Sequence, residues 1–348
     1  MNDSILNFRF DGLSEKGFFD KPYRANQVFK FIYDSCIFDF NDMTNIPLDL
    51  RKLLSENFRI LTIIESGRRT SSDGVIKFLF ELDDKNYVES VYLKDKNNRV
   101  TFCVSSQCGC RMGCAFCKTG DMGLIRNLRS DEILSQVLYL YKIMKEDELV
   151  VDKYFNIVFM GMGEPLDNLL NVKTAISNLV DKKNLGISQT RITISTCGVA
   201  DKIEDLLESF PDITLAVSLN SPEQSEREKM MPISKKFPLN LLFQEIKRLY
   251  GIYKNRITLE YVLIKGVNMK QQDVDLLSQI DKDIFHINLI PINTAVNDPR
   301  RPSEPEIKNF MDKLTATGLK VTRRYRRGAD INADCGQLFY EKYITGVV

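Results

Sequence analysis

The chain has 348 residues, of which 43% are hydrophobic and 27% charged, and its formal net charge is +1. This composition is that of an ordinary soluble globular protein, and a nearly neutral chain can bind nucleic acid only through local patches. No uncharged apolar run approaches the about 20 residues of a membrane-spanning helix, and the N-terminal stretch MNDSILNFRFDG lacks the pattern of a signal peptide. We therefore expect a cytoplasmic protein that does not contact a membrane.

Residues 1–95 predict a small α+β accessory domain. Two helix-like stretches are followed by three strand-like ones, and the turn formers SSDG and DDKN separate the strands. The predicted helices cover residues 23–36 and 47–58, and the predicted strands cover 60–66, 75–82 and 87–93.

From residue 96 to residue 348 the sequence alternates between strand-like and helix-like segments, which predicts parallel β/α units. Six such units make an α/β fold with an incomplete (β/α)6 barrel rather than a closed eightfold barrel. The predicted strands are 100–106, 155–161, 191–197, 213–219, 257–264 and 285–292, and a last strand at 319–327 leads into a tail. The clearest predicted helix begins with Ser130 as N-cap, and others begin near Asn171, Lys202, Pro238, Gln271 and Glu304.

Five of the eight cysteines lie between residues 103 and 117. Without a secretion signal, clustered cysteines indicate a metal or catalytic site in a reducing compartment rather than structural disulfides. Cys110, Cys114 and Cys117 form C-x3-C-x2-C on the loop after the first core strand. Three thiolates on a short loop can bind three irons of a cubane [4Fe–4S] cluster and leave the fourth iron open to substrate. Structural zinc and unligated thiols are the alternatives, although structural zinc takes four ligands, commonly as paired C-x2-C units.

Several stretches resemble the radical S-adenosylmethionine (SAM) superfamily and, within it, the RlmN/Cfr family of RNA adenosine methyltransferases. They are CVSSQCGCRMGCAFCKTG, FMGMGEPLDN, ITISTCGV, MPISKKFP, INLIPIN and GADINADCGQL, together with YRANQVFKFIY near the N-terminus. The resemblance implies a radical-SAM core over residues 96–348, a [4Fe–4S] cluster on the three cysteines, two SAM molecules per turnover and a separate electron-donor protein.

The resemblance places the SAM site at the ends of successive predicted strands, where barrel enzymes build their active sites. Gly163 and Glu164 of the GMGEP stretch are expected to contact the amino end of SAM, although these glycines would also suit an ordinary βα turn. One position departs from the family, because Asn220 stands where the family usually has histidine. Asparagine cannot titrate near neutral pH. The other residues expected to line the site are Ser195, Ser218, Leu219 and Asn293.

Two further cysteines and a carboxylate take catalytic roles by the resemblance, although each alone would pass for a packing or surface residue. Carbons C2 and C8 of adenine are electron-poor and do not attack the methyl group of SAM, whereas a thiolate does. The resemblance implies that Cys335 accepts a methyl group, which is then activated by a radical and joined to adenine. Cys103 releases the product by forming a transient disulfide with Cys335, and Glu89 accepts the proton.

The densest basic stretch, KVTRRYRRG at 320–328, predicts an RNA contact, because arginine beside an aromatic ring suits phosphate binding and base stacking. A charged edge strand that prevents aggregation is the alternative. The target base is expected to be flipped or unpaired. The lone histidine, His286, is expected to be a packing residue. Basic residues that extend this surface over the accessory domain are Lys21, Arg24, Arg68 and Arg69.

By the resemblance, the expected activity is methylation of adenosine C2 in 23S rRNA at the peptidyl transferase centre and in tRNA beside the anticodon, by a monomeric enzyme. Within the family the alternative is C8 methylation, which confers antibiotic resistance. The stretches TGDMGLIRNL and QCGC favour C8, whereas GMGEP favours C2. Outside the family, the alternative is a non-catalytic RNA-binding protein stabilised by zinc.

Overall fold

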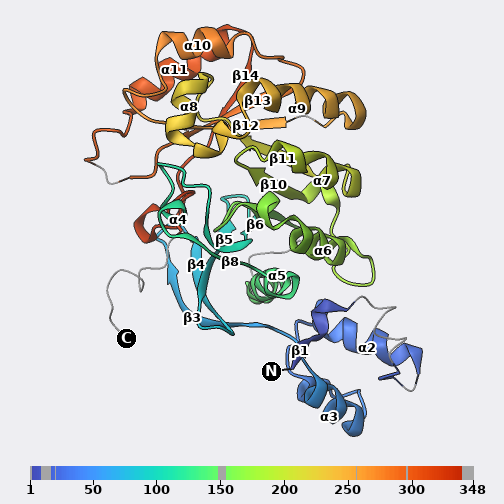
Figure 1. The fold of residues 1–348 in the computed structure, drawn as a ribbon. Helices are drawn as coiled ribbons and strands as arrows, with labels where there is room; N and C mark the ends of the chain where they lie inside the picture. The colour runs from blue at the N-terminus through green and yellow to red at the C-terminus, as the bar shows by residue number, and fades with distance from the viewer. Residues whose placement is uncertain are drawn as a thin grey trace.

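The computed structural model describes residues 2–8, 17–19, 21–147, 154–255, 257–294 and 297–338. Among these residues, ten strands form one sheet in the order β14-β13-β12-β11-β10-β9-β6-β5-β4-β3 (Figure 1). Since β14 and β3 are the two edges of this sheet and do not pair with each other, the barrel is incomplete. The α/β fold predicted from the sequence is confirmed.

Seven consecutive strands of the sheet run parallel and follow the order of the chain. Most of their apolar side chains are buried, as is typical of parallel strands covered by helices. The six predicted core strands are all present, although the first ends three residues earlier than expected. The parallel strands are β6 (Val100–Cys103), β9 (Phe155–Phe159), β10 (Ile192–Thr196), β11 (Thr214–Ser218), β12 (Ile257–Leu263), β13 (Phe285–Pro291) and β14 (Lys320–Arg323).

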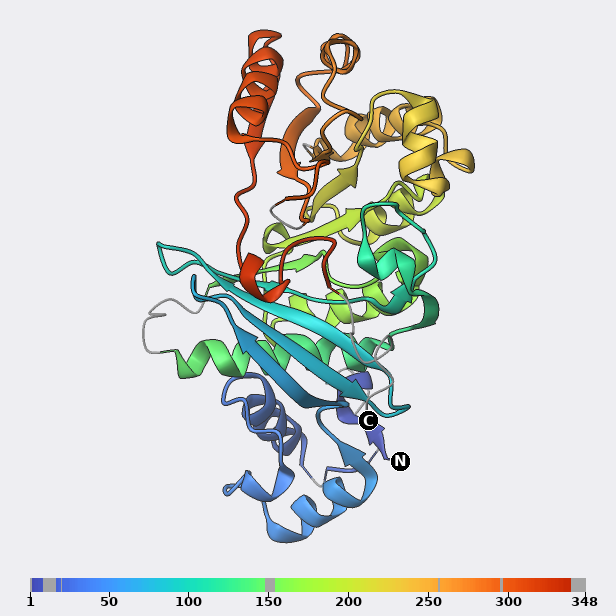
Figure 2. The ribbon, with the colours of Figure 1, turned by 90° about the vertical axis from the view of Figure 1, so that its left-hand side faces the viewer.

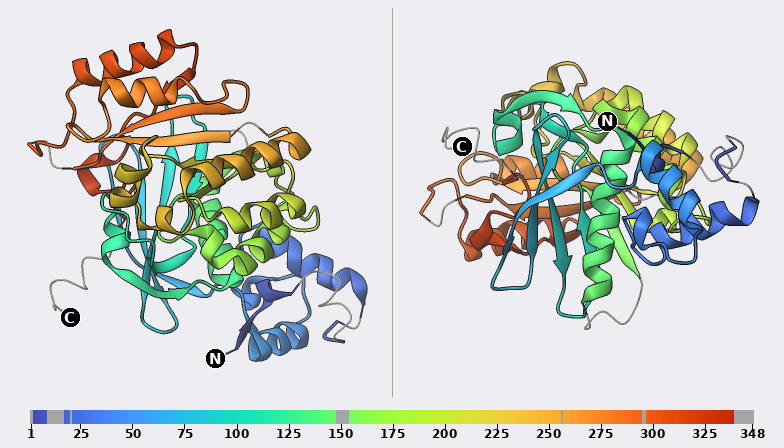
Figure 3. Two further views of the ribbon diagram at one scale, coloured as in Figure 1. Left: turned by 45° about the horizontal axis from the view of Figure 1, so that its top comes forward. Right: turned by 90° about the horizontal axis from the view of Figure 1, so that it is seen from below.

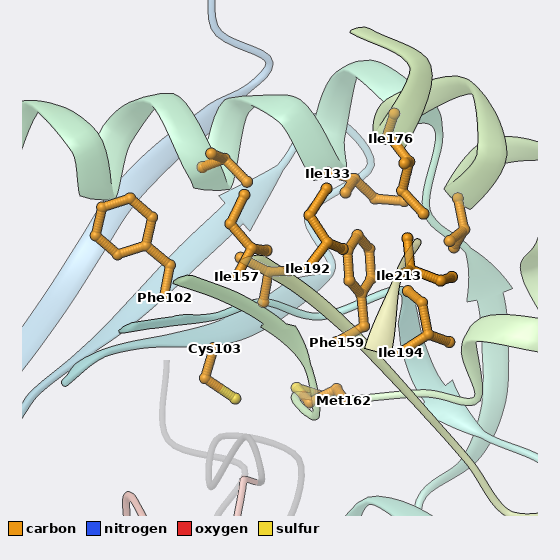
Figure 4. Close-up of a cluster of buried hydrophobic side chains, with 14 of the residues drawn as sticks. Phe102, Cys103, Ile133, Ile157, Phe159, Met162, Ile176, Ile192, Ile194 and Ile213 are labelled. Atoms are coloured by element: carbon orange, nitrogen blue, oxygen red, sulfur yellow. The ribbon is translucent and has the colours of Figure 1, made fainter. Parts of the chain in front are cut away.

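Helices follow these strands and cover the outer face of the sheet. In Figure 4, Ile133 of α5 and Ile176 of α6 lie over Phe102, Ile157 and Ile192 of the strands, all of them buried. The helices are α5 (Ser130–Glu146), α6 (Leu169–Val180), α7 (Ile203–Ser209), α8 (Gln224–Met230), α9 (Leu239–Tyr253), α10 (Gln271–Leu277) and α11 (Glu304–Ala316). Within the described ranges, no helix is long and apolar enough to cross a bilayer.

The predicted N-cap of α5 is wrong by one residue. Ser130 is the first helical residue, and Arg129 is the N-cap. The backbone N–H of Arg129 donates to the Glu132 carboxylate at 2.8 Å, so a glutamate in the first turn stabilises this helix start in place of the serine hydroxyl.

The N-terminal region has two parts. Helices α2 (Pro22–Tyr33) and α3 (Leu48–Asn57) lie below α5 with the short parallel pair β1 (Asp3–Ser4) and β2 (Phe58–Arg59) (Figures 1 and 3). Strands β3 (Ile63–Thr70), β4 (Ile76–Leu82) and β5 (Tyr87–Lys94) instead extend the main sheet, because β5 pairs antiparallel with β6. The predicted boundary at residue 95 therefore falls between two hydrogen-bonded strands of one sheet.

Two segments without a place in the main sheet complete the molecule. The cysteine loop and the short helix α4 (Lys118–Asp121) lie between β7 (Gln107–Cys110) and β8 (Gly123–Asn127), which pair as an antiparallel hairpin. After β14 the chain continues as a tail, residues 324–338, that runs back beside β3, β4 and β5 (Figure 2). In this tail, the Asp330 carboxylate accepts hydrogen bonds from the Ser71 hydroxyl and from the backbone N–H of Ser72.

Candidate active site

The three cysteines of the loop line one cavity at the ends of the parallel strands. Cys110 ends β7, and Cys114 and Cys117 follow in the loop before α4. The loop is held by backbone hydrogen bonds, since the N–H of Cys117 donates to the Cys114 carbonyl at 3.0 Å and the N–H of Ala115 donates to the Met230 carbonyl of α8 at 2.9 Å. Burial raises the pKa of Cys110 to about 12 and raises that of Cys114 further. Metal binding here must therefore release protons.

This donor set fits a [4Fe–4S] cluster. Cys110, Cys114 and Cys117 line one cavity, and three thiolates suffice to bind three irons of a cubane. A structural zinc ion takes four ligands, commonly as paired C-x2-C units, and this loop supplies one such unit.

Residues at four of the other strand ends line the same cavity. These are Gly163, Glu164, Ser195, Ser218, Asn220 and Asn293, whereas Leu219 is absent from the lining and is only 1% exposed. The structure thus brings six of the seven predicted SAM residues together around the cavity and places the Leu219 side chain outside its lining, because consecutive residues at a strand end point in different directions.

Gly163 and Glu164 also shape their own loop. Gly163 has a φ of +103°, and a Cβ at this position would lie 2.6 Å from the Cβ of Gln107. The Glu164 carboxylate is buried and accepts hydrogen bonds from the backbone N–H groups of Leu166 at 3.0 Å and Cys197 at 2.7 Å. Burial raises the pKa of Glu164, and these two N–H groups oppose the rise. Both residues are therefore required by the turn as well as by any ligand.

Asn220, which replaces the usual histidine, has a local structural role. Its φ is +58°, a left-handed conformation that asparagine tolerates well. Its side-chain oxygen accepts from the backbone N–H of Val262 at 2.8 Å, and its Nδ2 lies 3.1 Å from the sulfur of Met231. The position works here by tying β12 to the loop after β11, for which a titratable ring is unnecessary.

The tail brings Cys335 into this cavity. The Cys335 carbonyl accepts from Asn293 Nδ2 at 2.9 Å, and the next carbonyl, of Gly336, accepts from the N–H of Lys118 at 2.9 Å. The tail is therefore fastened both to the end of β13 and to α4 of the cysteine loop. A thiol from residue 335 and the three thiols of residues 110–117 line one space.

Cys103 lies next to this cavity rather than in it. It ends β6 and lines a smaller adjoining cavity that Cys335 also lines. Burial, and then the neighbouring Cys335 sulfur, raise the pKa of Cys103 to about 12. All eight cysteines of the chain are free thiols. Cys335 thus lines one cavity with the cysteine loop and the adjoining cavity with Cys103.

Glu89 lines neither cavity. It is buried on β5, and its carboxylate forms an ion pair with Lys77 at 2.9 Å. Lys77 Nζ also donates to the Asn332 carbonyl of the tail at 3.2 Å. The carboxylate is therefore linked to the segment that carries Cys335 but does not face the cysteine loop.

The four arginines of the basic stretch differ in their surroundings. Arg323 pairs with Glu304, Arg326 with Asp334 and Arg327 with Asp73. Between them, Tyr325 is 72% exposed and lies 5.1 Å from the Arg323 guanidinium carbon. Arg324 lines both cavities, with Nη1 3.3 Å from the sulfur of Met160, and it forms no ion pair among the described residues.

On the accessory region, Lys21 and Arg24 lie over the ring of Tyr23. Arg68 is paired with Glu65. His286 is half-buried and shares a hydrogen bond with the Thr322 hydroxyl at 2.7 Å, as a packing residue would.

Comparison with known proteins decides the family. The model of the radical SAM superfamily matches residues 104–277, and that of the ribosomal RNA large subunit methyltransferase N-terminal domain matches residues 6–60. A protein of Clostridium novyi named "Probable dual-specificity RNA methyltransferase RlmN" is 42% identical over 342 residues, which cover 96% of this chain and 97% of that protein. The chain belongs to the RlmN family. A Thermotoga petrophila protein of the same name is 40% identical over 318 residues, covering 91% of each.

A solved structure agrees with this membership. The crystal structure of a radical SAM methyltransferase from Sphaerobacter thermophilus matches with a TM-score of 0.91 at 35% identity, over 97% of this chain and 99% of that chain. The resemblance to the RlmN family seen in the sequence is confirmed. Membership of the radical SAM superfamily implies a [4Fe–4S] cluster and SAM as cofactors.

Sequence reasoning missed two charged residues of this RlmN-family site. Glu260 lines the cavity from the middle of β12, where it accepts a hydrogen bond from Asn288 at 3.0 Å. Burial raises its pKa, and Arg324 opposes this rise. The sequence could have indicated Glu260, because it is a charged residue within the apolar run ITLEYVLI. It could not have indicated Arg324, because three further arginines lie beside it in the sequence and nothing distinguishes it from them.

Proposed function

We propose that this chain is a SAM-dependent RNA methyltransferase that adds a methyl group to C2 of adenosine, in 23S rRNA and in tRNA. Membership of the RlmN family supports the reaction type. The observation that carries the proposal is a single cavity lined by three cluster-type cysteines and by Cys335, with Cys103 in the adjoining cavity.

In this proposal Cys110, Cys114 and Cys117 hold the cluster through their thiolates. When bound, the cluster supplies the electron that cleaves SAM to methionine and a 5′-deoxyadenosyl radical. Gly163, Glu164 and the other strand-end residues around the cavity bind and orient SAM. A separate reducing protein serves as the electron donor, and the enzyme works as a cytoplasmic monomer.

Cys335 is the methyl carrier. As a thiolate it attacks the methyl group of a first SAM, so that a sulfur–carbon bond forms and S-adenosylhomocysteine leaves. The 5′-deoxyadenosyl radical takes a hydrogen atom from this methyl group and becomes 5′-deoxyadenosine, and the methylene carbon then bonds to adenine. The adduct loses a proton from the base to Glu89 and one electron to the oxidised form of the electron-donor protein. Cys103, as a thiolate, attacks the Cys335 sulfur, so that the carbon–sulfur bond breaks, a disulfide forms and the released carbon takes up a proton to become the methyl group. Because Glu89 lies outside both cavities, the tail or β5 must shift before this carboxylate meets the base.

RNA would approach from the side of the tail and the accessory region. The exposed ring of Tyr325 offers a stacking surface beside the cavities. Arg323, Arg326 and Arg327 are each paired with a carboxylate, so phosphates would have to compete with these ion pairs. Residues 1–95, with Lys21 and Arg24 around Tyr23, extend the proposed contact surface.

The test is nucleoside mass spectrometry of 23S rRNA and tRNA after anaerobic reaction with the reconstituted protein, SAM and a reductant. We expect 2-methyladenosine in both RNAs, and none with protein whose iron has been removed. Detection of 8-methyladenosine alone would overturn the C2 assignment in favour of the family's other activity. A colourless, zinc-containing protein that binds RNA without methylating it would overturn the enzymatic proposal.

A further inference from the structure

Arg227 is a buried cation to which the described residues supply no carboxylate partner. It lies in α8, has no exposed surface and is among the largest fully buried side chains described. Within the described residues it forms no ion pair with a carboxylate. An uncompensated buried charge is costly, and buried arginines are rare unless paired. A negative charge that forms near Arg227 in the working protein would therefore stabilise this buried guanidinium.

Its hydrogen-bond partners are all neutral. Nε donates to the Leu219 carbonyl at 3.1 Å, and Nη2 donates to the carbonyls of Ser218 at 3.0 Å and Cys197 at 2.8 Å. Nη1 donates to the Ser234 hydroxyl. The planar fork thus ties together the loops that follow β10 and β11, two loops that line the cavity. These bonds satisfy the donors but leave the charge uncompensated.

The helix that carries Arg227 also supports the cysteine loop. The carbonyl of Met230, the last residue of α8, accepts from the N–H of Ala115, which directly follows Cys114. Cys197 and Cys114 are the groups whose negative charge would favour the charged guanidinium, against the burial that lowers its pKa. The charge of Arg227 therefore acts on the side of the cavity where the cluster thiolates form.

We propose that Arg227 is a positioning residue whose fixed positive charge compensates the anionic cluster and makes the cluster easier to reduce. This inference rests on the proposed function, since it requires that Cys110, Cys114 and Cys117 hold a cluster. Each thiolate that binds iron adds a negative charge, and reduction adds one more. Net charge and hydrogen bonding near a cluster set its reduction potential, so a nearby buried cation raises that potential.

The experiment compares the variants Arg227→Gln and Arg227→Lys after anaerobic reconstitution. Iron and sulfide content, melting temperature and an EPR-monitored redox titration are measured for each protein. In Arg227→Gln we expect the reduction equilibrium to shift at least tenfold toward the oxidised cluster, which is 59 mV for a one-electron couple. In Arg227→Lys the charge remains and the fork is lost. We therefore expect a reduction equilibrium constant within about threefold of wild type and a melting temperature lowered as in Arg227→Gln.

A matched control lies on the same helix. Lys229 is exposed and pairs with Glu226, so Lys229→Gln should leave both the potential and the melting temperature unchanged. An unchanged potential in a fully loaded Arg227→Gln protein would overturn the inference while leaving the proposed function intact. If Arg227→Gln does not fold, Arg227→Lys still tests the inference. A tenfold shift of the reduction equilibrium in this charge-conserving variant would contradict it. A wild-type protein that takes up no iron and sulfide would overturn the proposed function and this inference together.

Discussion

The two walls of the cavity are built differently. On the strand-end wall, polar side chains are buried and committed to fixed partners, as with the Glu164 carboxylate, the Asn220 amide and the Arg227 fork. The tail wall, residues 324–338, is held at separate points by single hydrogen bonds, such as those from Lys77 and Asn293, and by ion pairs such as Arg327 with Asp73. Partly exposed ion pairs contribute only about 0–1 kcal/mol each. The strand-end wall suits bound cofactors, and the tail wall suits the mobile thiol that the proposed function requires.

The largest effect should come from removing the thiol of the tail wall. Cys335→Ala should lower RNA methylation by about a thousandfold or more, because the thiol proposed to carry the carbon is lost. The cluster should be unaffected, since Cys335 is not one of its ligands. Product nucleosides and iron content together check this prediction, and persistent methylated adenosine would refute the carrier role.

Removing the proposed resolving thiol should stop the reaction at the covalent adduct between Cys335 and the RNA base. With Cys103→Ala, the bond between Cys335 and the base cannot be broken by disulfide formation. Most of the RNA that has reacted should therefore remain covalently attached to protein. A denaturing gel before and after nuclease treatment measures the adduct, and Cys36→Ala, which alters a buried thiol far along the chain, is the control. Free methylated RNA without an adduct would argue against this role.

A smaller effect should follow from Arg324, the arginine of the basic stretch for which the described part of the chain shows no ion pair. Burial raises the pKa of Cys335, and Arg324 opposes this rise. In Arg324→Gln the pKa should rise further, so that less thiolate exists at neutral pH. We expect methyl transfer from SAM to Cys335 to fall about tenfold, roughly 1.4 kcal/mol, and its pH profile to move to higher pH.

The control for this effect is Arg323→Gln, in which an arginine paired with Glu304 is removed. It should leave the pH profile of methyl transfer in place. An unshifted profile in Arg324→Gln would show that the arginine does not act on the thiol.

The smallest effect should come from loosening the tail wall. Arg327→Gln removes the ion pair with Asp73 and the hydrogen bond to the Lys94 carbonyl. Because this pair is partly exposed, its loss should cost about 0.5–1 kcal/mol, a two- to fivefold increase in tail opening. Hydrogen exchange of residues 324–338 measures this opening. Exchange in α6, on the strand-end side, should not change, and a global increase would instead indicate general destabilisation.

The features that the sequence could predict are local in the chain, and those that it could not predict depend on contacts formed by folding. Local patterns predicted the strands that follow each other in the core and the cysteine loop, because alternation and ligand spacing are local properties. The contacts of Arg324 with Met160 and of Arg327 with Asp73 join residues far apart in the chain, so the four similar arginines could not be told apart from the sequence. For the same reason neither the buried position of Arg227 nor the pairing of β5 with β6 followed from the sequence.

The most direct test of the account is the position of the methyl group on the protein. The reconstituted enzyme is incubated anaerobically with SAM that carries an isotope-labelled methyl group, without RNA, and its peptides are then analysed by mass spectrometry. The account predicts one labelled methyl group on Cys335 and none on the other seven cysteines. A label on a different residue, or no label in a protein that nevertheless methylates RNA, would contradict it.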